Sequence, residues 1–142
     1  MQFNIGMCGP SDKSLGYLRV GLAWNIYGFG RNKVNSSLES FRNLIREVRS
    51  WDAFVKTNRL EIEWIHHWKK DAIAQTQTND ITEWLLQPPL PHYDWILIGR
   101  LLRRDIDTVT LADPARLKNV IDSVFSGFLP LWEETQYRAR AR

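Results

Sequence analysis

The chain has almost no cysteine, and this absence limits both its stabilisation and its chemistry. A single cysteine, Cys8, stands among 142 residues, which excludes an internal disulfide and any zinc cluster built on several cysteines. No apolar run approaches the roughly 20 residues of a membrane-spanning helix. The first residues also lack the basic and apolar regions of a signal peptide. We therefore expect a cytoplasmic protein.

The body of the chain also lacks a net charge. The formal charge of +3 equals the three arginines of the tail, Arg138, Arg140 and Arg142. Removing these three from the 19 basic residues leaves 16, against 16 acidic residues. Binding to a polyanion would therefore depend on local clusters of cations and not on bulk charge.

Recognisable catalytic and metal-binding motifs are missing. There is no Gly-x-Ser-x-Gly nucleophile elbow, and Gly28-Phe-Gly30 lacks the remaining residues of a phosphate-binding loop. His66 and His67 are adjacent, so on a strand they would point to opposite faces and would not bind one ion together. The sequence predicts no catalytic residue, no metal and no cofactor.

Two carboxylates, Glu61 and Glu63, alternate onto one face of a predicted strand. Together with Asp80 they form the basis of a hypothesis of a small metal-dependent nuclease. However, the residue after Glu63 is Trp64 and not the lysine of the usual nuclease core. We expect both carboxylates to be solvated on the outer face of the strand.

Hydrophobic periodicity predicts an α+β fold. The length suggests one domain over residues 1–135, with 136–142 as a basic tail or the start of a linker. We expect a single mixed or mostly antiparallel sheet of about four to five strands, with two long helices and one short helix mainly on one face. The expected strands are 3–7, 17–27, 60–65 and 94–102, and the expected helices are 36–57, 80–86 and 113–128.

Local signals support three of the helix starts. Ser36 to Glu39 fits a capping box, and Asp80 begins a similar pattern. Asp113 followed by Pro114 is a favoured helix start. The polar segment 71–79 is expected to be a loop.

The strand at 17–27 has two contrasting faces. One face is apolar, and the other carries Arg19, Gly21 and Ala23, whose small residues leave room for an approaching group. We expect a crossing helix to cover this second face, with a ligand as the alternative occupant.

The chain is rich in tryptophan, with seven in 142 residues. Such a surplus indicates either a dense core or an aromatic surface that stacks on flat groups such as bases. Aromatic and basic residues interleave in two places, and from them we predict nucleic-acid contacts by Arg19, Tyr27, Arg31, Lys33, Trp68, Lys69 and Lys70. Trp68 is the first choice for stacking, with Trp24 or Tyr27 as second choices.

The last third of the chain resembles a known group of modules. A hydrophobic strand ending in Ile-Gly, Trp95-Ile-Leu-Ile-Gly-Arg-Leu-Leu, leads to Asp113-Pro-Ala-Arg-Leu and then to Val124-Phe-Ser-Gly-Phe-Leu-Pro-Leu-Trp132. This succession resembles the N-terminal specificity modules of McrBC-type, modification-dependent restriction systems. The resemblance implies binding to double-stranded DNA, often at a modified base, while a fused or associated motor or nuclease domain does the chemistry.

Three hypotheses of function follow. The first is a non-catalytic DNA-binding module that reads a methylated or otherwise modified base by aromatic stacking. The second is a protein-interaction or scaffold domain of a defence or phage-related system, since aromatic residues are also enriched at protein interfaces. The third is the metal-dependent nuclease described above.

Overall fold

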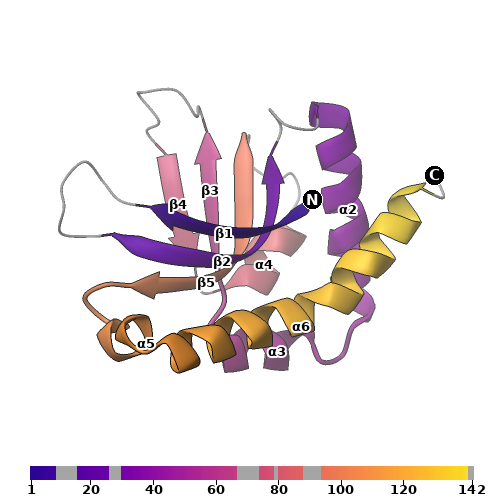
Figure 1. Ribbon diagram of the computed structural model, residues 1–142. Helices are drawn as coiled ribbons and strands as arrows, with labels where there is room; N and C mark the ends of the chain where they lie inside the picture. The colour runs from indigo at the N-terminus through magenta and orange to yellow at the C-terminus, as the bar shows by residue number, and fades with distance from the viewer. Residues whose placement is uncertain (9–15, 26–29, 67–73, 79, 88–93, 141–142) are drawn as a thin grey trace.

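The computed structural model describes residues 1–8, 16–25, 30–66, 74–78, 80–87 and 94–140 (Figure 1). Its elements follow one another as β1 (Gln2–Cys8), β2 (Tyr17–Asn25), α2 (Arg31–Glu47), α3 (Trp51–Asn58), β3 (Glu61–His66), β4 (Ala74–Thr78), α4 (Ile81–Leu86), β5 (Trp95–Arg103), α5 (Thr108–Ala112) and α6 (Pro114–Arg140). None of the helices in these ranges is long and apolar enough to span a membrane.

One sheet of five strands organises the fold, in the order β1-β2-β5-β3-β4. Every neighbouring pair is antiparallel, so β5 is the central strand, and β2 and β3 on either side of it point the same way. The α+β prediction is confirmed. The fifth strand, β4, lies within the polar segment 71–79, so the prediction of a loop there was wrong. This Gln- and Thr-rich segment has no apolar alternation of its own, and it forms a strand because it pairs with β3.

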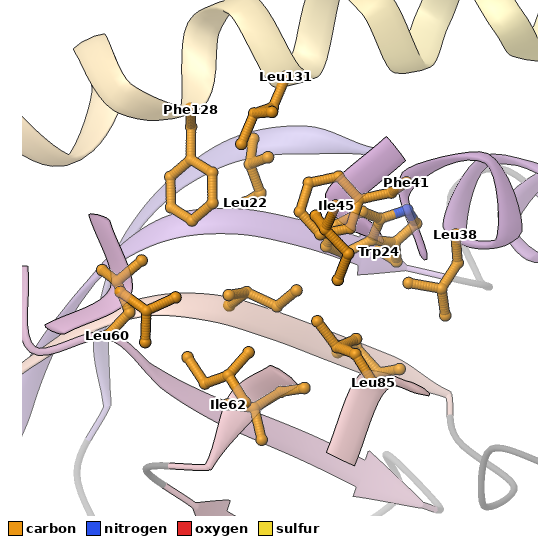
Figure 2. Close-up of a cluster of buried hydrophobic side chains, with 14 of the residues drawn as sticks. Leu22, Trp24, Leu38, Phe41, Ile45, Leu60, Ile62, Leu85, Phe128 and Leu131 are labelled. Atoms are coloured by element: carbon orange, nitrogen blue, oxygen red, sulfur yellow. The ribbon is translucent and has the colours of Figure 1, made fainter. Parts of the chain in front are cut away.

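The hydrophobic core lies between one face of the sheet and four helices. Alternate residues of β2, Val20, Leu22 and Trp24, are buried on this face. Figure 2 shows Phe128 and Leu131 of α6 directed toward them. Side chains of α2, α3 and α4 join the same cluster. Burial of each large apolar side chain contributes roughly 1.5–3 kcal/mol, so this face provides most of the stabilisation.

The first long helix starts earlier than its capping signal predicts. α2 begins at Arg31 after the N-cap Gly30, so Ser36 lies inside the helix and the predicted capping box does not form. The reason is that Val34 is buried and extends the apolar stripe one turn toward the N-terminus. Val48 is extended, and the chain restarts as α3, so the predicted helix 36–57 is two helices.

The last helix continues past its predicted end. Asp113 accepts hydrogen bonds from the N–H groups of Ala115 and Arg116, which confirms the predicted start. α6 then runs through Gly127 and Pro130 to Arg140, into the segment predicted to be a tail. It is held there because Arg138 binds Glu47 of α2.

Candidate nucleic-acid interface

Three strand termini meet at one end of the sheet. The register pairs Asn25, the last residue of β2, with Trp95, the first residue of β5. Trp95 in turn pairs with Ile65 near the end of β3. α2 begins beside them, since the Arg31 guanidinium lies 3.5 Å from the carboxylate of Asp94. We call the end of the sheet marked by these five residues the strand-end surface; it lies at the top of Figure 1.

The first turn of α2 carries two of the predicted phosphate contacts at this surface. Arg31 and Lys33 are exposed, and Arg31 keeps 44% of its side chain accessible despite its contact with Asp94. The turn contains no acidic residue, and no described side chain caps it. The positive end of the helix dipole therefore adds to the positive potential of the two cations.

The remaining predicted contacts follow directly on the strand ends. Tyr27, Trp68, Lys69 and Lys70 lie outside the described residues. The described chain nevertheless fixes their points of attachment, since β2 ends at residue 25 and β3 at residue 66. The ends of β2 and β3, which the two predicted aromatic and basic clusters follow in the sequence, therefore lie together at the strand-end surface.

Arg19 differs from the other predicted contacts because protein groups surround it. It lies on the sheet face opposite the hydrophobic core, with only 12% of its side chain exposed. Its Nε donates to Asn4 Oδ1 at 3.1 Å, and one terminal nitrogen lies 3.6 Å from Glu63 Oε1. Its guanidinium carbon stands 4.2 Å from the centre of the Trp95 ring, a distance typical of a cation–π contact. Arg19 therefore links β1, β2, β3 and β5.

The two carboxylates of β3 are buried, so the expectation that they are solvated was wrong. Glu63 is fully buried beside Arg19. Glu61 receives two hydrogen bonds from Arg103, at 2.6 and 2.5 Å, and these bonds raise the pKa of the Arg103 guanidinium. Arg103 on the neighbouring strand β5 and Arg19 on β2, the strand beyond it, compensate these carboxylates, which is why burial is tolerated. In the ranges that the structure describes, no three His, Cys, Asp or Glu residues are grouped to hold a metal.

The predicted crossing helix is absent from this face among the described residues. The helices α2, α3, α4 and α6 pack into the core on the other side of the sheet, and the second cluster of buried apolar residues consists of sheet residues alone. The helix was expected because sheets in α+β domains usually bury one face under helices. Instead, Gly99 lies opposite Gly21, and a Cβ on either residue would come within 2.2 Å of the backbone of the other strand. These two glycines therefore allow the close approach of β2 and β5.

Most of the tryptophans belong to the interior. Trp24, Trp51 and Trp95 are buried. Trp24 therefore presents no surface for stacking, and this one of the two second choices was wrong. Trp64, Trp84 and Trp132 pack partly buried against the core. Trp68 lies outside the described residues. The dense-core interpretation therefore explains six of the seven tryptophans.

Comparisons of the chain with protein-family models, curated proteins and solved structures gave no match. Geometry and chemistry therefore carry the functional argument.

Proposed function

We propose that this chain is a non-catalytic module that binds double-stranded DNA at the strand-end surface. One observation carries the proposal: β2, β3 and α2 bring the attachment points of both aromatic and basic clusters to one end of the sheet. Clusters that are distant in sequence then act on one ligand. A neutral body with locally grouped cations and aromatic rings matches recognition of a polyanion that carries flat bases.

Each predicted residue has a role in this proposal. Arg31, Lys33, Lys69 and Lys70 contact backbone phosphates and position the duplex. Trp68 stacks on a base, and Tyr27 is the second aromatic contact. Arg19 acts indirectly, because its contacts with Asn4, Glu63 and Trp95 fix the strands from which the surface is built.

Recognition of a methylated or otherwise modified base is the finer form of the proposal. The resemblance of the last third to modification-dependent restriction modules supports it, and it implies a fused or associated motor or nuclease domain as a partner. The nuclease hypothesis gains no support from the structure, because Glu61 and Glu63 are each paired with an arginine.

A gel-shift titration tests the proposal. The probes are plain, hemimethylated, fully methylated and hydroxymethylated duplexes of one sequence, at two salt concentrations. We expect the chain to shift duplex DNA more strongly at low salt and to prefer one modified probe. Trp68→Ala should lose roughly 1–3 kcal/mol of binding free energy through loss of stacking. Tyr137→Ala is the matched control, since this exposed ring lies near the end of α6.

Two results would contradict the proposal. The first is that all four probes stay unshifted at low salt. The second is that Trp68→Ala, with an unchanged circular dichroism spectrum, binds DNA as well as the wild type. Equal binding to all four probes would contradict only recognition of a modification.

A further inference from the structure

We propose that β1 is a docking edge through which two copies of this chain join their sheets in antiparallel orientation. β1 is an edge strand of the sheet. Within the described ranges it pairs with β2 alone, so the backbone groups along its other side have no partner strand. An edge of this kind is a template for pairing with another chain.

The side chains of β1 show none of the usual protection against edge pairing. Natural edge strands carry charged residues, especially lysine, or proline, or are covered by another element. The sequence of β1, Gln-Phe-Asn-Ile-Gly-Met-Cys, contains no charge and no proline. Ile5 and Met7 are 52% and 90% exposed, whereas Phe3 on the same face is covered by Phe125 of α6, with ring centroids 4.9 Å apart.

A second copy is the partner that fits this edge. If two β1 strands pair with Ile5 opposite the same residue of the other copy, Phe3 lies opposite Met7 on both sides. The apolar residues of one face then bury each other, and no like charges meet. The net charge of only +3 gives weak repulsion between copies. A charged peptide would find no complementary charge along β1.

Analytical ultracentrifugation over a wide concentration range tests the proposal. We expect a reversible monomer–dimer equilibrium for the wild type and loss of the dimer in Ile5→Lys and in Met7→Lys. Leu129→Lys is the matched control, because Leu129 is an exposed apolar residue on α6, and this variant should dimerise like the wild type. Circular dichroism checks that each variant is folded.

A second measurement tests the register: Ile5→Cys in a Cys8→Ser background should form an intermolecular disulfide, since directly opposed residues bring their Cβ atoms within about 5 Å.

Several outcomes would overturn the proposal. A wild-type chain that stays monomeric at every concentration excludes the docking edge. A dimer that survives Ile5→Lys, or one that Leu129→Lys also removes, places the interface elsewhere. A dimer of the Ile5→Cys variant that does not crosslink contradicts the register centred on Ile5.

Discussion

At the scale of single residues, the contact between Arg19 and Glu63 shows how an outward-facing charge becomes part of the interior. Alternation along β3 places Glu63 on the face away from the helices, where a carboxylate is normally solvated. Arg19 reaches it from β2, two strands away. The sequence predicted which face each residue occupies but not this contact, because the two strands are brought together only by β5.

Replacing Arg19 tests how much this contact contributes to the free energy of unfolding. Arg19→Met keeps most of the side-chain volume but leaves Glu63 buried without its guanidinium partner. We expect a loss of about 3–5 kcal/mol in the free energy of unfolding, measured by urea denaturation. Lys118→Met is the control, since its ion pair with Asp122 is exposed, and it should change stability by less than about 0.5 kcal/mol. A loss below about 1 kcal/mol in Arg19→Met would show that the buried carboxylate does not depend on Arg19.

A second residue-scale prediction concerns Glu47 and Arg138, which tie the end of α6 to α2. Hydrogen bonding from Arg138 lowers the pKa of Glu47. A lowered pKa means that the pair contributes stability above the ordinary glutamate pKa and loses it as the pH falls through the folded-state value. Arg138→Ala should therefore raise the Glu47 pKa toward its ordinary value, as measured by NMR titration of the carboxyl group. An unchanged titration midpoint would show that the ion pair does not persist in solution.

At the scale of elements, the hydrophobic pattern was the reliable predictor and the local signals were less so. The apolar run from Trp95 predicted a strand, and β5 forms there as the central strand of the sheet. Ser36 failed as a helix start because burial of Val34 outweighed its capping signal. The predicted helix end at residue 128 was also wrong, as α6 continues through Pro130 to Arg140. Pairing and packing, which depend on distant residues, decided these cases.

The close approach of β2 and β5 provides the prediction at this scale. A Cβ on Gly21 would lie 2.1 Å from the backbone oxygen of Ile98, whereas one on Gly127 would meet the side chain of Phe54. Backbone in a central strand cannot move aside, but a ring can rotate. Gly21→Ala should therefore cost about 3 kcal/mol or more in the free energy of unfolding. Gly127→Ala should cost less, because the gain of roughly 1 kcal/mol in helix propensity offsets part of the clash. The reverse order in thermal or urea denaturation would contradict the proposed tight strand approach.

At the scale of the whole molecule, strand order creates the candidate interface. The sequence predicted two aromatic and basic clusters as separate patterns. It offered no means of bringing the ends of β2 and β3 together, because these ends become neighbours only through the insertion of β5 between the two strands. The topology also places α5 and the start of α6 at the other end of β5, at the lower left of Figure 1. Removal of cations from the start of α6 can therefore serve as a control for removal of the cations that follow the end of β3.

The central claim is that DNA binds at the strand-end surface, and the salt dependence of the dissociation constant tests it most directly. The measurement uses fluorescence anisotropy of a labelled duplex with the wild type, Lys69→Gln/Lys70→Gln and Arg116→Gln/Lys118→Gln. The last variant removes two exposed cations from the first turns of α6, at the opposite end. The logarithm of the dissociation constant rises linearly with the logarithm of the salt concentration, and each lost phosphate contact should reduce the slope of this line by about 0.9. We predict that the slope falls by about 2 in the Lys69/Lys70 variant and stays at the wild-type value in the Arg116/Lys118 variant. Equal slopes in all three proteins, or a reduced slope only in the Arg116/Lys118 variant, would contradict the account.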